Sequence, residues 1–421
     1  MSRKNRRPAT CLVGFLVFVF ACLGVGYYVI VSVLGRNATE VEVATARARE
    51  LRLDSPRFPS PPANPSDNAA TLFHELNARV STALGKKLVD GEKSFGSTLI
   101  DALVKATRKP ILYYDLRAKV WREELPSSYE ANAVQQLLSL EARACLESEN
   151  WEREVGVLQA LRRLTLLRRQ LPDLQYWKQS IYCELEIHRV IDKWLDEYGS
   201  PPSVLLPLSA LIDPSEEMGN LPQMLRNEAA RNRVSLEGLK TLSDLKRLSH
   251  SIGDPFGKIR FPFAVSIPRP ILNAWILKNL RTHISIAEQL GTKPNWLRIA
   301  ESLESAAQKA AQDDSISGRV NRMALPPLES VAFLVRRLIT ERRLMRLKIA
   351  ILRARKIPSS LAEFGRDGID PITGKSFMLT RTPDHLTISS AIQNLNKRRF
   401  LSRDIDLSHL DAVRRESPQS G

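Results

Sequence analysis

The strongest constraint on this chain is an uninterrupted apolar stretch near its N-terminus, Cys11–Leu34. The stretch contains no charged side chain, and Ser32 is its one plainly polar residue. A helix rises about 1.5 Å per residue, so a helix over this stretch can cross a hydrocarbon core of roughly 30 Å. The sequence therefore predicts a transmembrane helix over 11–34, and every later inference depends on the side of the membrane that the other residues occupy.

The charges that flank the apolar stretch predict its orientation. Four cations and no acid precede it, whereas acidic and basic residues are mixed after it: Arg3, Lys4, Arg6 and Arg7 come before, and Arg36, Glu40, Glu42 and Arg47 come after. Because positive residues stay on the cytoplasmic side, we expect a cytoplasmic tail over 1–10 and an extracytoplasmic body on the inner (cytoplasmic) membrane of a bacterium.

A cleaved signal peptide is the alternative interpretation of the same stretch. The apolar core of a signal peptide spans about 7–15 residues and ends at a site of small residues. The stretch in this chain is longer, and its exit, Ser32-Val33-Leu34-Gly35, matches such a site poorly. The sequence therefore favours an uncleaved, single-pass signal anchor.

Proline and helix signals divide the rest of the chain. Asp54–Asn68 holds five prolines, which disfavour helix and sheet and predict a semi-rigid spacer. Beyond it, apolar residues keep helical spacing, as in Trp177, Ile181 and Leu185. Helices are predicted to begin after Asn68, at Pro126, at Trp151 following a break at Glu149-Asn150, and at Pro172. Further helices are predicted over Ile271–Leu290, Trp296–Ala311 and Leu328–Lys356. No repeat of fixed period is present, so we expect a helical array and not a tetratricopeptide-type repeat.

The C-terminal region has the pattern of a β-hairpin. Asp370-Pro371 and Gly374 favour a turn, and apolar residues then alternate at Phe377, Leu379, Leu386 and Ile388. The predicted fold is thus mainly α, with one N-terminal transmembrane helix, a helical-array body and a small hairpin. The predicted regions are 1–10 (basic tail), 11–34 (anchor), 35–68 (proline-rich linker), 69–253 (helical domain), 254–364 (second helical region) and 365–421 (hairpin and tail).

The order of these features resembles a group of membrane-anchored helical proteins of planctomycete-type bacteria. The matching motifs are Asp67-Asn68-Ala69-Ala70, Pro358-Ser359-Ser360-Leu361-Ala362-Glu363-Phe364 and Ile369-Asp370-Pro371-Ile372-Thr373-Gly374-Lys375-Ser376-Phe377. The resemblance implies an anchored helical architecture and a short C-terminal hairpin, without an assigned chemistry.

The turn at Asp370 is also similar to the C-terminal segment of type II secretion pseudopilins. In those proteins the chain continues into a glycine- and acid-containing ending that is associated with calcium. Here Thr387-Ile388-Ser389-Ser390-Ala391 stands in its place, without those glycines or acids. The resemblance therefore does not imply a calcium site in this chain.

Motifs for catalysis, metal ions or cofactors are not found in the sequence. The six histidines occur in no pair with zinc-ligand spacing, and there is no P-loop, GxGxxG or GxSxG motif. We therefore assign no catalytic, metal-binding or cofactor-binding residue and expect no cofactor. Cys145 and Cys183 lie on predicted helices, where two buried free thiols are favoured over a disulfide.

A cluster of cations marks the last long predicted helix. The chain carries a net charge of +16, and nine basic residues lie between positions 336 and 356 of this helix, a span in which Glu341 is the only acid. They form a candidate surface for anionic lipid or another polyanion: Arg336, Arg337, Arg342, Arg343, Arg346, Lys348, Arg353, Arg355 and Lys356. The alternative is a solvated face with acids from neighbouring helices nearby. Nucleic acid is disfavoured as a partner, because the predicted topology puts this helix outside the cytoplasm.

The leading hypothesis for function is a scaffold or interaction module of the cell envelope, with the membrane and other envelope proteins as partners. One alternative is an envelope hydrolase whose active site is assembled from residues far apart in the sequence. A second is a pseudopilin-like secretion component. The absence of catalytic motifs in the sequence favours a non-enzymatic role.

Overall fold

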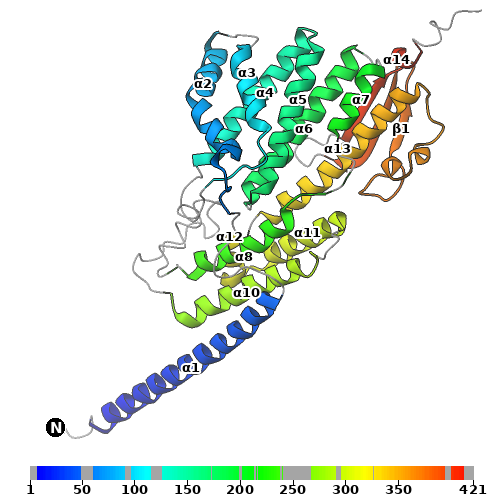
Figure 1. Cartoon of the computed structure of the whole chain (residues 1–421). Coiled ribbons are helices and arrows are strands. Elements are labelled where there is room, and N and C mark those ends of the chain that lie inside the picture. The colour runs from blue at the N-terminus through cyan, green and yellow to red at the C-terminus, as the bar shows by residue number, and fades with distance from the viewer. Residues whose placement is uncertain are drawn as a thin grey trace, which may run out of the picture. The chain divides into compact units, whose positions relative to one another are not determined.

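The computed structural model confirms a mainly helical fold with one long apolar helix at the N-terminus and a small antiparallel sheet near the C-terminus (Figure 1). It describes residues 7–48, 60–90, 96–114, 126–171, 173–198, 202–212, 215, 217–237, 239, 267–290, 295–325, 327–393 and 400–411. Arg3, Lys4 and Arg6 of the predicted tail, residues 54–59 of the predicted spacer, Pro172 and the C-terminal tail after residue 411 lie outside these ranges.

Segments that are distant in the sequence combine into two compact units. Unit 1 consists of residues 1–56, 225–291 and 305–328, and unit 2 consists of residues 57–224, 292–304 and 329–421. Each unit is described separately below.

Unit 1 is built from α-helices. Its described elements are α1 (Arg7–Ala48), α8 (Leu221–Glu237) from Leu225 onward, α10 (Arg269–Ala287), the end of α11 (Trp296–Gln312) and α12 (Ile316–Ala324). The core of this unit gathers apolar residues of α8, α10 and α12 around Trp275, which is 3% exposed. The end of α1 joins this core through Ala46.

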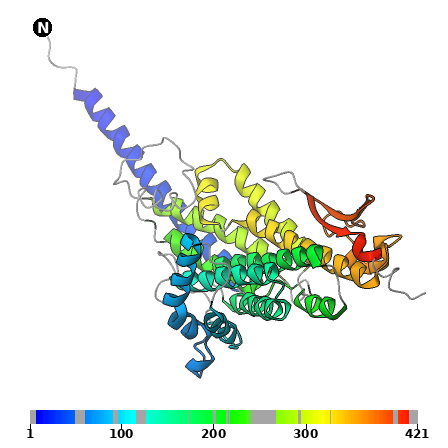
Figure 2. The same ribbon diagram turned by 90° about the horizontal axis from the view of Figure 1, so that it is seen from above.

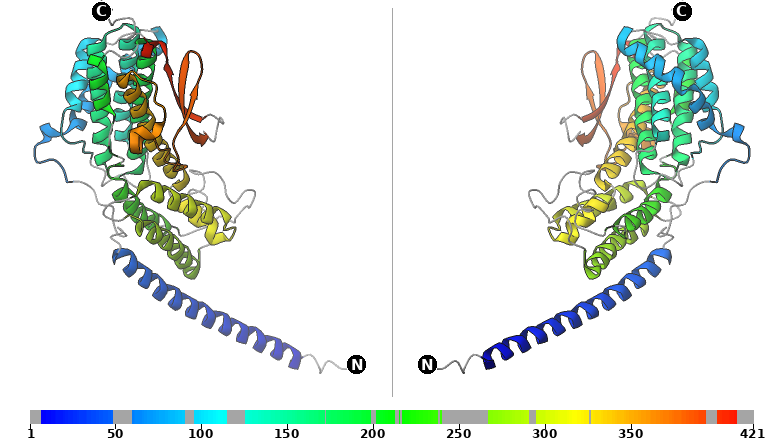
Figure 3. Two further views of the ribbon diagram at one scale, coloured as in Figure 1. Left: turned by 90° about the vertical axis from the view of Figure 1, so that its right-hand side faces the viewer. Right: turned by 90° about the vertical axis from the view of Figure 1, so that its left-hand side faces the viewer.

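Helix α1 corrects the start of the predicted linker. We predicted a linker from residue 35, but α1 continues without a break to Ala48 (Figure 3). The segment 35–48 contains no proline, and Arg36 pairs with Glu40 one turn later at 3.0 Å, a spacing that supports a helix. The membrane-length helix and the unit 1 core are therefore joined by continuous helix.

Unit 2 contains the helical array and the sheet. Its helices are α2 (Ala69–Asp90), α3 (Ser97–Thr107), α4 (Pro126–Glu147), α5 (Trp151–Gln170), α6 (Leu174–Tyr198), α7 (Pro202–Leu211), α13 (Leu328–Ala354) and α14 (Ser408–Asp411), with 3-10 helices η1 (Pro65–Asp67) and η2 (Leu361–Gly368). Helices α4, α5 and α6 lie side by side, with α2 and α3 on one flank and α13 and the sheet on the other (Figure 2).

Local sequence signals determine where the helices of the array begin and end. Glu149 has a left-handed backbone, with φ of 56°, and this ends α4. The side chain of Asn150 then accepts a hydrogen bond from the backbone N–H of Arg153 at 3.3 Å and caps α5. Asn68 caps α2 in the same way through the N–H of Ala70. The predicted breaks at 149–150 and before Ala69 are thus confirmed.

The C-terminal sheet contains the predicted hairpin and one further strand. Strands β1 (Met378–Arg381), β2 (His385–Gln393) and β3 (Phe400–Asp406) are antiparallel in the order β1-β2-β3. Leu379 pairs with Ile388, and Ile388 pairs with Arg403. Our prediction missed β3 because Arg403, Asp404 and Asp406 interrupt its apolar pattern.

The turn that precedes the sheet is closed as the sequence predicts. The N–H of Gly374 donates to the carbonyl of Asp370 at 2.9 Å, and Gly374 adopts φ of 67°, a conformation that favours glycine. The hydroxyl of Ser390 on β2 donates to the Asp370 carboxylate at 3.1 Å. Asp370 therefore binds the turn to the sheet.

Candidate functional site

Helix α13 lies in the interior of unit 2. The helical spacing of its apolar residues predicts an apolar stripe along one face, and all six residues of that stripe are buried: Val331, Leu334, Leu338, Met345, Ile349 and Leu352. The opposite side of the helix is also covered, because Glu341, Arg342, Arg343 and Lys348 are at most 4% exposed. The helix is therefore enclosed over its middle turns and has no continuous solvated face.

This burial corrects the predicted cationic surface. Arg342, Arg343 and Lys348 are buried and so cannot belong to a surface that binds a polyanion. Three other cations are half-buried and pair with carboxylates at the following positions: Arg336 with Glu304, Arg337 with Glu341, and Arg346 with Asp367. Arg353 and Lys356 are exposed and Arg355 is half-buried, all at the end of the helix. Polyanion binding by these last three residues stays a prediction.

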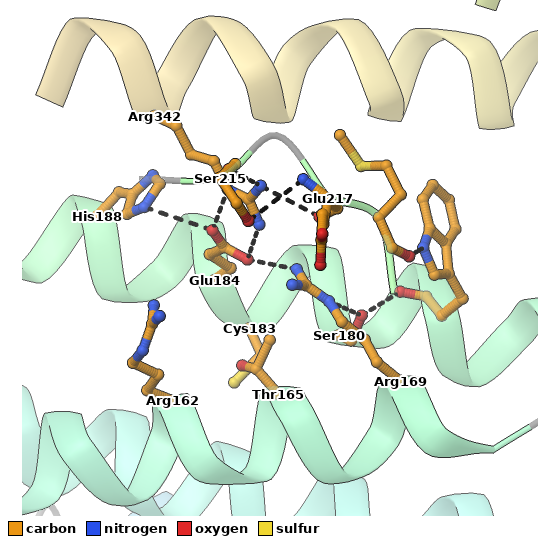
Figure 4. A network of polar contacts seen from close by, with 12 residues as sticks. Arg162, Thr165, Arg169, Ser180, Cys183, Glu184, His188, Ser215, Glu217 and Arg342 are labelled. Atoms are coloured by element: carbon orange, nitrogen blue, oxygen red, sulfur yellow. Dashed lines mark hydrogen bonds and ion pairs between the residues drawn. The ribbon is translucent and has the colours of Figure 1, made fainter. Parts of the chain in front are cut away.

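Two of the buried cations, Arg342 and Lys348, meet a polar stripe on α6. Its four members recur every four residues and so share one helix face; we call Glu184, His188, Asp192 and Asp196 the α6 polar stripe. Figure 4 shows Arg342 of α13 and Arg169 of α5 converging on the Glu184 carboxylate. Arg342 donates to both carboxylate oxygens, at 2.6 and 3.0 Å, in the bidentate geometry of strong guanidinium–carboxylate pairs.

Further hydrogen bonds extend from this centre to a loop and to α6. Arg342 also donates to the backbone carbonyls of Ser215 and Glu217, at 2.8 and 3.2 Å. Arg169 donates to the hydroxyl of Ser180 at 3.4 Å, and that hydroxyl donates to the carbonyl of Trp177. The Glu184 carboxylate therefore connects α5, α6, α13 and the loop before α8.

Burial and charge have opposite effects on the pKa of Glu184. Burial by itself raises the pKa of this carboxyl group, but attraction to Arg342 and Arg169 outweighs burial and holds the pKa well below its usual range. Burial lowers the pKa of the neighbouring His188 to about 3, and the attraction of Glu184 offsets this only in part. Glu184 is thus charged and His188 neutral at pH 7.

The second half of the stripe binds Lys348 and Arg403. The Lys348 ammonium group lies 2.7 Å from Asp192 and 2.5 Å from Asp196. Arg403 of β3 pairs with Asp192 at 3.5 Å and with Glu341 of α13. These contacts join α6, α13 and the sheet, so the stripe stabilises the packing of unit 2 on both sides of α13.

A groove on unit 2 lies beside α13. It has a volume of about 740 Å³ and is lined by α7, α13 and η2, through Ser209, Ala210, Ile212, Arg346, Ile349, Ala350, Arg353, Ala354 and Asp367. Small-molecule and peptide sites typically have volumes of about 300–1,000 Å³. The groove thus combines an apolar lining with two of the predicted cations.

The two cations of the groove differ in their pairing. Arg346 binds Asp367 through two hydrogen bonds, of 2.9 and 2.5 Å. Arg353 is exposed and forms no ion pair with any residue that the structure describes. An incoming carboxylate can therefore pair with Arg353, while the alanines and isoleucines beside it accept apolar side chains.

No family model, curated protein or solved structure matches this chain. Within the described ranges, no group of three or more His, Cys, Asp or Glu side chains is arranged to hold a metal ion. Cys145 and Cys183 are buried free thiols, as the sequence favoured.

One buried acid outside the stripe was also missed. Glu154 on α5 is 1% exposed, and its carboxylate oxygens have no hydrogen-bond partner among the described residues. Burial, and next the charge of Glu197, raise the pKa of Glu154 to about 8. The sequence does not indicate that a single acidic residue within a helix is buried. The four residues of the α6 polar stripe, by contrast, recur every four positions, and this spacing indicates a shared helix face.

Proposed function

We propose that this protein is a single-pass, signal-anchored protein of the bacterial cytoplasmic membrane whose helical body serves as an interaction module in the cell envelope. The observation that carries the proposal is the apolar part of α1. Its side chains are exposed along the helix, as in Phe20 (70%), Leu23 (63%) and Tyr27 (71%). An apolar surface of this length is stable when lipid covers it.

Helical continuity supports a retained anchor over a cleaved signal peptide. Helix α1 passes from the apolar stretch to the core of unit 1, where Glu42 pairs with Arg281 at 2.8 Å. Cleavage after the apolar stretch would cut this continuous helix and leave residues 35–48 as a short N-terminal helix packed on unit 1. The anchored helical architecture also agrees with the planctomycete-type group that the sequence resembles.

The retained anchor is tested by mass spectrometry of the protein extracted from membranes. The proposal predicts an intact chain that includes residues 11–34 and that stays in the membrane fraction after a carbonate wash. A mature chain that begins after residue 34, or release by carbonate, contradicts it.

The interaction role is assigned to the groove beside α13. We expect a partner segment that presents an acidic side chain to Arg353 and an apolar side chain to Ala350 and Ala354. Leu206 supports this role, because it is 63% exposed and lies one turn before Ser209 and Ala210 on α7. The apolar lining of the groove is thereby extended along α7.

The interaction role is tested by photo-cross-linking in intact cells from position 206. The proposal predicts a defined cross-linked adduct that is lost in Arg353→Glu. It predicts that the adduct is retained in Arg108→Glu, a change of the same type at an exposed position that ends α3. An adduct that is unaffected by Arg353→Glu, or no adduct at all, contradicts the role of the groove.

A further inference from the structure

The contact between α1 and α10 fixes the level of α10 along the membrane-length helix. Gly35, the first residue after the apolar stretch, packs against Asn273, whose Cβ lies 3.8 Å from where a Cβ on Gly35 would be. Seven residues later on α1, Glu42 pairs with Arg281, which is eight residues after Asn273. The two helices therefore run in the same direction, and α10 begins on the side of Gly35 that faces the apolar stretch.

The first turn of α10 consequently lies alongside the last residues of the apolar stretch. Arg269 precedes Asn273 by four residues, which is about 6 Å along a helix. This places Arg269 at the level of Val31 and Ile271 at the level of Val33, both within the apolar stretch of α1. The start of α10 thus shares its level with residues that the proposed anchor places in the outer part of the bilayer.

The side chains of this turn have the character that the membrane interface favours. Ile271 is 44% exposed and Arg269 is exposed, while the neighbouring Leu272 and Trp275 are directed into the unit 1 core. A cationic residue beside an exposed apolar residue suits the headgroup layer, where the guanidinium reaches phosphate and the apolar side chain reaches the acyl chains.

We infer that the first turn of α10, Arg269–Leu272, is a second membrane contact of unit 1, seated in the phospholipid headgroup layer beside α1. The inference rests on the proposed anchor function, because α1 must span the bilayer for its end to define the interface. With two contacts, one crossing and one peripheral, unit 1 is held in a fixed orientation on the membrane and cannot rotate freely on a single helix.

Depth-dependent fluorescence quenching of the full-length protein tests this inference. The protein is reconstituted in vesicles of phosphatidylcholine and phosphatidylglycerol, with Cys11→Ser and Cys22→Ser removing the thiols of the apolar stretch. An environment-sensitive fluorophore is attached to one introduced cysteine, Ile271→Cys, Ser285→Cys or Val25→Cys. Ser285 is the matched control, because it is exposed on the same helix about 21 Å farther from the membrane.

The three probe positions separate the inference from the proposal on which it rests. The inference predicts quenching by spin-labelled lipid at positions 25 and 271, with position 271 quenched about twofold or more relative to position 285. Quenching at position 25 with equal, weak quenching at 271 and 285 overturns the inference and leaves the anchor intact. Absence of quenching at position 25 overturns the anchor itself, and the inference with it.

Discussion

Removal of the Glu184 charge is expected to destabilise unit 2 strongly. Glu184→Gln keeps the size of the side chain but leaves the guanidinium groups of Arg342 (0% exposed) and Arg169 (6% exposed) without their shared carboxylate. Breaking a buried ion pair by removal of one partner costs about 3–5 kcal/mol. Since domains are typically stable by about 5–15 kcal/mol, this loss is a large fraction of the total.

The assay is urea unfolding of the full-length protein in detergent micelles, followed by tryptophan fluorescence. Trp177 reports on this region, because its indole N–H donates to the carbonyl of Met218 at 2.9 Å within the same network. Lys193→Gln is the control on α6, since Lys193 is 54% exposed and pairs with Glu197 at 3.3 Å. An exposed pair of this kind is worth about 0–1 kcal/mol.

A compensating variant distinguishes charge from packing. When Glu184→Leu is combined with Arg169→Met and Arg342→Met, no buried charge is left unpaired, and much of the lost stability should return. Two results would refute the reasoning: a loss below about 1 kcal/mol in Glu184→Gln, or a triple variant that is less stable than the single one.

Three further predictions concern stability. Burial holds the pKa of His188 at about 3 in the folded state, against an ordinary 6.5, so only the unfolded chain gains the proton as pH falls between these values. His188→Leu should therefore reduce the loss of stability with falling pH by up to about 1.4 kcal/mol per pH unit. Identical pH slopes for the wild type and the variant, in urea titrations from pH 6.5 to 4.5, would count against this. Burial raises the pKa of Glu154 to about 8, so the folded state loses stability as pH rises from 4.5 through 8. Glu154→Gln should therefore raise the unfolding midpoint more at pH 9 than at pH 5. An equal rise at both pH values would disprove this prediction. Gly374→Ala places a Cβ at φ of 67° and should cost about 1 kcal/mol, seen as a lower midpoint in thermal unfolding; an unchanged midpoint would show that the turn tolerates the Cβ.

The sequence predicted those elements whose signals are local. The break at Glu149 and Asn150, the cap at Asn68 and the turn from Asp370 to Gly374 each depend on residues within one or two helical turns of one another. The buried stripe of α13 followed from its periodicity alone. In these cases a few neighbouring side chains decide the backbone conformation.

The site could not be predicted from α13 alone, because its partners are distant in the chain. Arg342 and Glu184 are separated by 158 positions, and Lys348 and Asp192 by 156. Nine cations on one helix are typical of a solvated face, and only the fold brings the α6 polar stripe against two of them, Arg342 and Lys348. Strand β3 was missed for a related reason: Arg403 is charged, yet it is covered in unit 2 by pairing with Glu341 and Asp192.

Labelling of one exposed cysteine directly tests the proposal that the helical body lies outside the cytoplasm. Glu75→Cys on α2, with Cys11→Ser and Cys22→Ser, is treated with a membrane-impermeant maleimide in spheroplasts and again after lysis. The proposed topology predicts labelling at position 75 before lysis, while Ser2→Cys in the same background reacts only after lysis. Labelling at position 75 that requires lysis would contradict this topology, because it would place the helical body in the cytoplasm.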